Sequence, residues 1–358
     1  MVGFNDIYRG KTVLVTGHTG FKGSWLVLWL LELGATVIGY ALDPYTTKDN
    51  YVLAGLEDKI IDIRGDIRDY DRLQAVVQQH KPEFVFHLAA QSLVGASYKE
   101  PVDTYMVNVI GTIHVLEAIR TCDETKVGIM VTTDKCYENK ESSLGYKESD
   151  CLGGHDPYSS SKGAAELAIS SWRRSFFDSA DNEHHNASIA SVRAGNVIGG
   201  GDWSTNRIVP DCIRALEGDG LIAIRHPESI RPWQHVLDPL SGYLLLGEKM
   251  YSNPGQYCQA WNFGPKESAS YSVWDISTRI IDHYGSGILV DQSSKNGFHE
   301  ATLLKLNIEK AKNKLNWLPT LTIEETIEFT IDWYLNYKEQ NVYKICKEQI
   351  EKFMHKSG

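Results

Sequence analysis

One stretch near the start of the chain, KTVLVTGHTGFKGSWLVLWLLELGATVIGYALD over 11–43, constrains its fold more than any other. A short β-branched run is followed by three regularly spaced glycines, by an apolar run over 24–33 and by a second β-branched run over 36–42. The outer runs are typical of strands, while the inner run is apolar on nearly all sides, as a buried helix is. The pattern therefore predicts a strand–helix–strand unit with parallel strands.

The three glycines of this unit, Gly17, Gly20 and Gly23, lie at the turn between the first strand and the helix. Glycine allows a tight turn there and lets backbone amides approach a pyrophosphate at the helix N-terminus. The second strand ends in Asp43, where a carboxylate suits the ribose hydroxyls of adenosine and disfavours a 2′-phosphate. We therefore expect a site for NAD rather than NADP. A tight turn without a ligand is the alternative.

The alternation of strands and helices continues to about residue 195, which predicts a doubly wound parallel sheet with right-handed crossovers. Further strands are expected over 59–63, 83–89, 127–132 and 187–194, and further helices over 67–80, 104–120, 158–177, 207–217 and 322–353. The predicted fold is α/β, with a Rossmann-type NAD-binding domain over 1–195 and returning pieces near 232–265. A smaller mixed α/β substrate-binding lobe, interleaved with it, is expected mainly over 196–358.

Charge and composition exclude several classes of partner. A net charge of −10 does not hold nucleic-acid phosphates by bulk attraction, and the longest apolar run, over 25–31, is too short to cross a membrane. The first residues lack the apolar region of a secretory signal. The six cysteines show neither a C-x-x-C motif nor zinc-ligand spacing, which predicts free thiols and no metal site. We expect a cytoplasmic protein without nucleic-acid or membrane partners.

The stretch PYSSSK over 157–162 contains a candidate catalytic pair. Tyr158 and Lys162 are four residues apart and therefore share one helix face. A lysine ammonium and the positive charge of a nicotinamide are expected to lower the pKa of the tyrosine from its reference of about 10, which makes it a base for a sugar hydroxyl. Tyr334 and Tyr343 show the same spacing to lysines, but only Tyr158 opens a helix after a strand and a proline.

A second group of polar residues ends the strand expected over 127–132. Thr133, Asp134 and Lys135 are three adjacent proton-handling residues where an ordinary strand exit has Gly, Asn or Ser. Open α/β sheets bind their ligands at the carboxyl ends of strands, so this position indicates chemistry. An exposed lysine at the end of a strand is the alternative interpretation.

Several motifs in order along the chain extend these features to a known family: TGHTGFKG, HLAAQ, MVNVIGT, TTDKCY, PYSSSK, RAGNVIGGGDW, RIVPD, RPWQHVLD and NWLP. Together they resemble the extended short-chain dehydrogenase/reductases, which act on nucleotide sugars with tightly held NAD. Within this family the chain is most similar to the nucleotide-sugar 4,6-dehydratases. The resemblance covers nearly the whole chain.

The resemblance implies roles for individual residues. The pyrophosphate is expected to contact Gly17, Gly20, Phe21, Lys22 and Gly23. Other cofactor contacts are expected from Asp43 at the ribose, from Asp66 and Ile67 at the adenine, and from Ala89, Ala90 and Asn108 beside the nicotinamide. Thr133, Tyr158 and Lys162 are expected to form the hydride-transfer triad, in which Tyr158 and Lys162 also contact the cofactor. Substrate contacts are expected from Thr133, Asn196, Arg207, Arg231, Gln234 and His299.

The implied reaction has three steps. Tyr158 removes the proton of the C4 hydroxyl while the C4 hydride passes to NAD, water is lost across C5 and C6, and the hydride returns to C6. The product is a 4-keto-6-deoxy nucleotide sugar, a precursor of deoxy and dideoxy sugars in surface polysaccharides such as lipopolysaccharide O-antigens. Asp134 and Lys135 are expected to be the acid and base of the elimination, in either order. Related thymidine-diphosphoglucose dehydratases carry Glu in place of Lys135.

Two other functions share part of this pattern. A nucleotide-sugar 4-epimerase uses the same fold, cofactor and triad but needs no elimination pair, so Asp134 and Lys135 argue against it. A non-catalytic NAD-binding regulator is expected to lose members of the triad, and all three are present. The family implies a homo-oligomer, a dimer or tetramer, that pairs through the helices expected over 104–120 and 158–177. The nucleotide base of the substrate does not follow from these residues.

Overall fold

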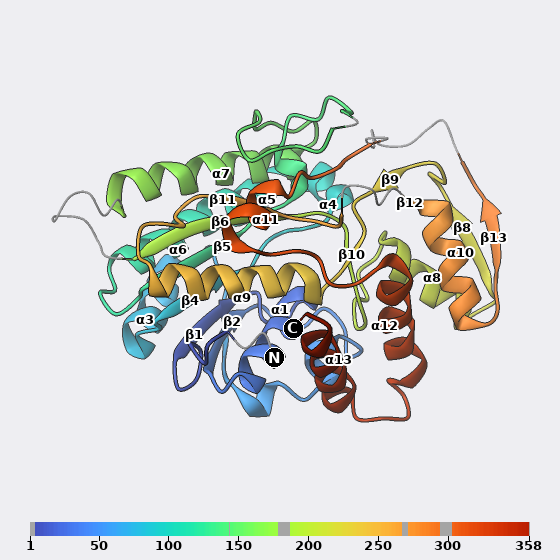
Figure 1. Ribbon diagram of the computed structural model, residues 1–358, viewed down its shortest axis with the longest axis horizontal. Coiled ribbons are helices and arrows are strands. Elements are labelled where there is room, and N and C mark those ends of the chain that lie inside the picture. The colour runs from blue at the N-terminus through green and yellow to red at the C-terminus, as the bar shows by residue number, and fades with distance from the viewer. Residues whose placement is uncertain (1–3, 143, 178–186, 267–270, 294–302, 358) are drawn as a thin grey trace.

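The computed structural model describes residues 4–142, 144–177, 187–266, 271–293 and 303–357. Its centre is a seven-stranded parallel sheet with the order β11-β6-β5-β4-β1-β2-β3 (Figure 1). The strands are β1 (Thr12–Thr16), β2 (Thr36–Ala41), β3 (Ile61–Arg64), β4 (Phe84–His87), β5 (Val127–Val131), β6 (Ser188–Ala194) and β11 (Ala260–Phe263). The order reverses between β1 and β4, as in doubly wound folds, so the predicted fold class is confirmed.

Helices cover both faces of the sheet because its strands are apolar on both sides (Figure 1). In β1, Val13 and Val15 belong to one hydrophobic cluster and Leu14 to the other. The covering helices are α1 (Phe21–Glu32) and α9 (Leu237–Ser252) on one face, and α3 (Tyr70–His80), α6 (Gly111–Arg120) and α7 (Pro157–Phe176) on the other. Helix α13 (Val342–Ser357) packs against α1, where Phe353 contacts Trp29. Within the described ranges, no helix has the length and apolar content that crossing a membrane requires.

A smaller mixed lobe stands beside the sheet (Figure 1). It pairs β8 with β13 in parallel and β9 with β12 in antiparallel orientation, and β7 pairs with β10 in parallel. Its elements are β7 (Val197–Ile198), α8 (Ile208–Leu216), β8 (Leu221–Ile224), β9 (Ile230–Arg231), β10 (Gln234–His235), β12 (Tyr271–Ser272), α10 (Val273–Tyr284), β13 (Ile288–Asp291) and α12 (Ile323–Asn336). The short remaining helices are α2 (Asn50–Leu53), η1 (Glu57–Lys59), α4 (Val94–Lys99), α5 (Pro101–Tyr105), η2 (Met106–Ile110), η3 (Asp134–Cys136) and α11 (Glu309–Leu315).

Two helices begin at different residues from those that the sequence predicts. Helix α1 begins at Phe21, so that Gly23 lies within its first turn rather than before it. Helix α3 begins at Tyr70 rather than near residue 67, because the carboxylate of Asp69 accepts a hydrogen bond from the backbone N–H of Arg72 at 3.1 Å and caps the helix there.

Two predicted helices are interrupted. The segment over 322–353 forms α12 and α13 as separate helices, and the side chain of Asn341 accepts a hydrogen bond from the N–H of Lys344 at 3.0 Å at the start of the second. The helix predicted over 104–120 contains the π-helical turn η2 between α5 and α6. Apolar spacing alone does not reveal either interruption, because the apolar face continues across both.

Candidate active site

The glycine turn between β1 and α1 has two glycines required by packing and one that leaves open space. Gly17 has a φ of +73°, and a Cβ on it would lie 2.6 Å from the backbone N of Ala89. A Cβ on Gly23 would lie 2.1 Å from the carbonyl oxygen of Gly17. Gly20 is exposed, and the nearest atom to its Cβ position is 3.4 Å away. A ligand can therefore approach the backbone at Gly20.

The N-terminus of α1 at this turn suits an anion. No side chain caps it and its first turn has no acidic residue, so backbone N–H groups remain for a ligand. Burial, together with the positive charges of Arg207 and Lys162, lowers the pKa of Lys22 to about 8, and Asp134 opposes the change. These three cations converge in a chain whose net charge is −10. The arrangement fits a diphosphate such as that of NAD or of a nucleotide sugar.

The residues expected at the adenosine end lie beyond the carboxyl ends of β2 and β3. The side chain of Asp43 is 87% exposed, and Arg64 Nε lies 3.6 Å from its carboxylate. The carboxylate of Asp66 binds the guanidinium of Arg68, with Nε at 3.0 Å from each oxygen, and Ile67 is buried. Both carboxylates therefore have an arginine neighbour, but the side chain of Asp43 is far more exposed than that of Asp66. A ribose contact by Asp43 stays a prediction.

The loop after β4 contains the residues expected beside the nicotinamide. Ala89 and Ala90 are half-buried there. Asn108, in contrast, is 1% exposed and uses its amide within the protein. Its Oδ1 accepts from the N–H of Gln91 at 2.9 Å, and its Nδ2 donates to the carbonyl of Gln91 at 3.0 Å and to Ser161 Oγ at 2.9 Å. Asn108 thus positions the loop against α7, and a direct cofactor contact stays a prediction.

His87, at the end of β4, is the core histidine that its apolar strand predicts. Its ring nitrogens lie 2.7 Å from Thr16 Oγ1 and 3.0 Å from Thr112 Oγ1, and burial lowers its pKa to about 3, with a smaller effect from Lys162. A neutral, fully bonded imidazole of this kind joins β1 and β4 to α6.

The candidate catalytic residues come together from β5 and α7. Thr133 follows β5, and its hydroxyl donates to Asp134 Oδ1 at 2.9 Å and accepts from the N–H of Lys135 at 3.3 Å. Helix α7 begins just before Tyr158, because Asp156 caps it by accepting from the N–H of Ser159 at 2.9 Å. Tyr158 and Thr133 share a hydrogen bond. The structure therefore brings Thr133 and Tyr158, two members of the predicted triad, into contact.

The pKa of Tyr158 differs from the prediction. Burial raises it to about 12, the hydrogen bond with Thr133 and the charge of Arg207 oppose that rise, and Asp134 adds to it. The sequence predicts a pKa lowered by Lys162 and the nicotinamide charge together, whereas the protein groups alone raise it. The reason is desolvation, since the phenol is 8% exposed and burial penalises the phenolate more than the nearby cations stabilise it.

Lys162 is a buried cation, and its removal should stabilise the protein. It is 4% exposed, its Nζ lies 3.5 Å from the carbonyl of Val131, and burial lowers its pKa from 10.5 to about 8 although Glu166 opposes this. A folded-state pKa below the unfolded value costs stability below about pH 8, and the cost disappears as the pH rises towards 10.5. The cost is on the order of 3 kcal/mol at pH 7.

We therefore expect Lys162→Met to raise the free energy of unfolding at pH 7 while it removes activity. In urea unfolding of protein freed of nucleotide, the difference from the wild type should shrink steadily between pH 8 and pH 10. Lys249→Met, at a surface lysine of α9, is a control that should show no such pH-dependent difference. Equal stability of wild type and Lys162→Met at pH 7 would contradict the expected cost of burying this cation.

Asp134 is 2% exposed, and its Oδ2 has no hydrogen-bond partner among the described residues. Burial raises its pKa, while Lys135, the hydrogen bond from Thr133 and Arg231 oppose the rise. A carboxyl with a raised pKa and an unsatisfied oxygen favours carrying a proton. Lys135 lies half-buried beside it.

The residues expected at the nucleotide diphosphate have different surroundings. Arg207 is 34% exposed in its side chain and forms an ion pair with Asp202 at 2.9 Å and a hydrogen bond to Ser92 Oγ at 3.0 Å. Arg231 is 4% exposed and donates to the carbonyl of Ile230 at 2.9 Å. Arg207 thus stays near the other cations of the site, held by residues to which the sequence assigned no role. The sequence distinguishes Asp202 only as the aspartate of the GGGDW motif.

Of the remaining predicted substrate contacts, Asn196 follows Gly195, whose Cβ position lies 2.7 Å from Asp134 Oδ2. Gln234 is 2% exposed and its Nε2 donates to the carbonyl of Phe263 at 3.0 Å, so it ties β10 to β11. Asn196 is half-buried, and its carbonyl accepts from the N–H of Gln234 at 3.2 Å. His299 and the FHEA stretch over 298–301 lie outside the described residues. A substrate contact by Gln234 would need its Oε1, which has no partner among the described residues.

A doubly wound sheet with a glycine turn after β1 and a Tyr–Lys pair at the start of α7 defines an NAD-dependent short-chain dehydrogenase/reductase. The chain belongs to the nucleotide-sugar epimerase and dehydratase family, and a family model described as GDP-mannose 4,6 dehydratase matches residues 14–330. It is 44% identical, over 350 residues and 98% of each chain, to the CDP-glucose 4,6-dehydratase of Salmonella typhimurium.

More distant relatives share the fold. The dTDP-glucose 4,6-dehydratase of Xanthomonas campestris is 26% identical, over 90% of this chain and 93% of its own. A crystal structure of dTDP-glucose 4,6-dehydratase from Bacillus anthracis in complex with NAD has a TM-score of 0.76 at 22% identity, and the match covers 92% of this chain and 98% of that one. The stretches HTGFKGSWL, TTDKCYEN, GGGDW and RPWQHVLDPLSGY resemble CDP-glucose 4,6-dehydratase in particular, and the 44% identity confirms that resemblance.

Proposed function

We propose that this chain catalyses the NAD-dependent dehydration of CDP-D-glucose to CDP-4-keto-6-deoxy-D-glucose. The observation that carries the proposal is the buried Asp134 with Lys135 beside it, joined through Thr133 to Tyr158. Oxidation at C4 needs one base, whereas loss of water needs a further acid and a further base. The site holds both sets of groups, and the 44% identity extends over 98% of the chain.

The residues divide the reaction between them. We propose that Tyr158, hydrogen-bonded to Thr133, takes the proton of the C4 hydroxyl. Lys162, one turn further along α7, is proposed to stabilise the phenolate. When bound, NAD accepts the hydride from C4 and gives it back to C6. Lys22 and the N-terminus of α1 hold the cofactor diphosphate, and Asp43 holds the ribose, while Arg207 and Arg231 bind the diphosphate of the substrate.

For the elimination, we assign Asp134 as the acid and Lys135 as the base. Burial raises the pKa of Asp134, so that its carboxyl can carry the proton that the C6 oxygen takes as it leaves. Its Oδ2 has no partner among the described residues and can face that oxygen. Lys135 then removes the proton of C5, which the C4 ketone has made acidic. A 4-epimerase requires neither step.

A substrate panel tests the proposal. Purified protein is incubated with CDP-, dTDP-, UDP- and GDP-glucose, and the products are analysed by mass spectrometry. Loss of one water from CDP-glucose, at a kcat/KM well above that for the other three, is the expected result. An unchanged mass with altered sugar stereochemistry would mean an epimerase, and no change with any substrate would mean a binding protein.

NAD should remain bound through purification, because a cycle that regenerates its cofactor has no step at which it must leave. The expected result is close to one NAD per chain in the supernatant of denatured protein, with turnover that added NAD does not stimulate. A preparation without NAD that still turns over without added cofactor would contradict the cofactor assignment. The double variant Gly20→Val/Lys22→Met should lose most of the bound NAD, because it fills the open space at the turn and removes the cation.

We further propose a homodimer that pairs through α5, η2 and α7. Large apolar side chains are exposed there, with Val102 at 76%, Met106 at 41% and Leu167 at 62%. The two helical segments are adjacent, since Tyr105 Oη donates to Ser160 Oγ at 2.7 Å. Light scattering should give twice the chain mass, and Leu167→Glu should shift the measured mass towards that of the monomer.

All six cysteines are free, which supports a reducing cytoplasmic location.

A further inference from the structure

A buried ion pair lies directly behind the catalytic segment. Glu166 and Arg193 are each 3% exposed in their side chains, and their carboxylate and guanidinium lie 2.7 Å apart. Glu166 belongs to α7, one turn after Lys162 and two turns after Tyr158, and Arg193 belongs to β6. Neither residue has a role in the reaction proposed above.

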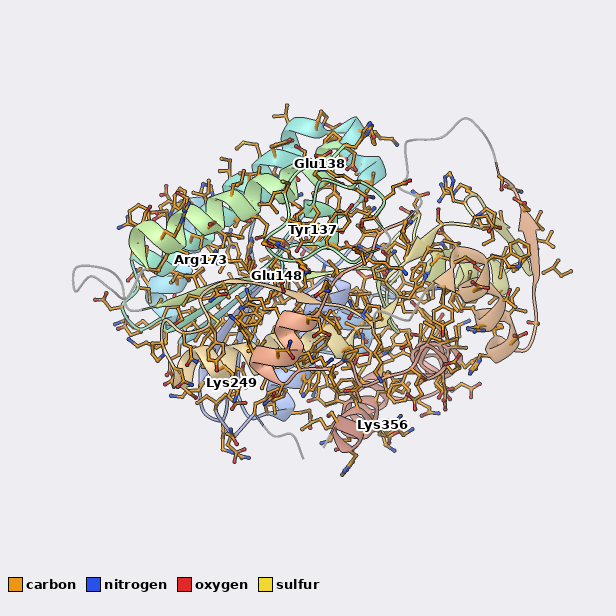
Figure 2. All side chains as sticks on the ribbon, turned by 45° about the horizontal axis from the view of Figure 1, so that its top comes forward. Tyr137, Glu138, Glu148, Arg173, Lys249 and Lys356 are labelled. Carbon is orange, nitrogen blue, oxygen red and sulfur yellow. The ribbon has the colours of Figure 1, made fainter. Side chains whose placement is uncertain are left out.

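Both members of this pair contact the segment TTDKCY over 132–137, one at each end. Thr132 Oγ1 donates to Glu166 Oε1 at the start of the segment. At its other end, Arg193 Nη1 donates to Tyr137 Oη at 2.7 Å. Thr133, Asp134 and Lys135 lie between these two anchors. Figure 2 shows Tyr137 close to Glu148, whose carbonyl also accepts from Arg193 Nη1 at 3.3 Å.

Both members of the pair are charged, and their hydrogen bonds define the position of the Glu166 carboxylate narrowly. Burial raises the pKa of a carboxyl, but the charge of Arg193 and the hydrogen bonds from Arg193, Thr132 and Ser191 lower the pKa of Glu166 below its ordinary value. Its second oxygen accepts from Ser191 Oγ at 2.8 Å. A carboxylate with charge-assisted bonds on both oxygens in a dry interior has a narrowly defined position. The groups bonded to it are held equally narrowly.

We infer that Glu166 and Arg193 are positioning residues, which clamp both ends of the 132–137 segment to α7 and so set the distance from Tyr158 and Lys162 to Thr133, Asp134 and Lys135. The inference rests on the proposed dehydratase function, because that reaction needs the base on α7 and the pair on the segment to act on neighbouring carbons of one sugar. A displacement of about 1 Å between reacting groups can cost on the order of 10²-fold in rate.

The alternative is that the ion pair only stabilises the core. Removing Glu166 or Arg193 does not separate the two ideas, because a lone buried charge destabilises the fold by itself. Substitutions that remove only a hydroxyl from a hydrogen-bond partner of the ion pair separate the two ideas better. Thr132→Val and Tyr137→Phe each remove one anchor with little change in volume, together with a second bond, from Thr132 to the Val192 carbonyl and from Tyr137 to Asn262 Oδ1. Ser191→Ala removes a bond to the same carboxylate from β6 without touching the segment.

The experiment compares kcat, KM, bound NAD and thermal unfolding for the three variants with CDP-glucose. We expect Thr132→Val and Tyr137→Phe to lower kcat about 10-fold with KM and bound NAD nearly unchanged, and the double variant to lower it further. Ser191→Ala should show a similar loss of melting temperature with kcat within about twofold of the wild type. An equal kcat for all three variants at equal melting temperature would overturn the inference.

A further variant covers the case in which an anchor deletion does not fold. Glu166→Asp keeps a negative charge in the pair but withdraws the carboxylate by one methylene from Thr132 and Arg193 alike, so both anchors loosen and the loss of kcat should be reproduced. Wild-type kcat in a folded Glu166→Asp protein would also overturn the clamp. The wild-type assay tests the proposed function separately, since a wild type that releases no water from CDP-glucose refutes that function, whereas an active wild type with insensitive anchors refutes only the clamp.

Discussion

Tyr158→Phe is expected to lower the rate of oxidation at C4 by about 10²- to 10⁴-fold, the usual cost of losing a general base. The substitution removes one hydroxyl from a side chain that is 8% exposed, with little change in volume, so the fold and the binding of NAD and substrate should remain. Because the protein groups alone raise the pKa of Tyr158 to about 12, its action as a base depends on the added positive charge of the bound nicotinamide.

The measurement is reduced-cofactor absorbance after rapid mixing with CDP-glucose, together with turnover by product mass. Tyr343→Phe is a matched control, because Tyr343 also precedes a lysine by four residues but bonds Glu32 at 2.6 Å at the surface of α13. That control should keep wild-type turnover. If Tyr158→Phe also does, the base lies elsewhere and the triad is wrong.

Lys135→Met is expected to separate the steps of the reaction. In the proposed mechanism, oxidation at C4 uses Tyr158, Thr133 and Lys162 and not Lys135, so reduced cofactor should form at about the wild-type rate. Elimination then lacks its base, and we expect turnover to fall by about 10²-fold or more. Reduced-cofactor absorbance should therefore rise and persist, with little 6-deoxy product.

Lys140→Met is the control for this experiment, because Lys140 is an exposed lysine just beyond the 132–137 segment. Normal turnover by Lys135→Met would remove the elimination role, and failure to form reduced cofactor would assign Lys135 to binding or to oxidation. Asp134→Asn should also stall after oxidation, since the amide cannot protonate the departing oxygen. If Asp134→Asn eliminates water at the wild-type rate, the assignment of the acid is wrong.

Local patterns in the sequence account for much of this enzyme. The glycine spacing at 17, 20 and 23, the strand before it and the acid at position 43 predict the βαβ unit and the diphosphate site, because a strand–turn–helix is formed by residues adjacent in the chain. The same holds for Tyr158 and Lys162, whose helical spacing places them together whatever surrounds them. The reaction is predicted by the motifs that the chain shares with the family.

The hydrogen-bond partners of the site residues and the pKa of Tyr158 are decided only by the tertiary structure. Asn108 and Gln234 have the residue types of ligand contacts, yet their amides bond Gln91, Ser161 and Phe263, which come from distant parts of the chain. The pKa of Tyr158 depends on burial, a sum over every element that packs around it, and this reverses the direction that a neighbouring lysine predicts. The Glu166–Arg193 pair joins a helix to a strand 27 residues away, and no local pattern indicates such a contact.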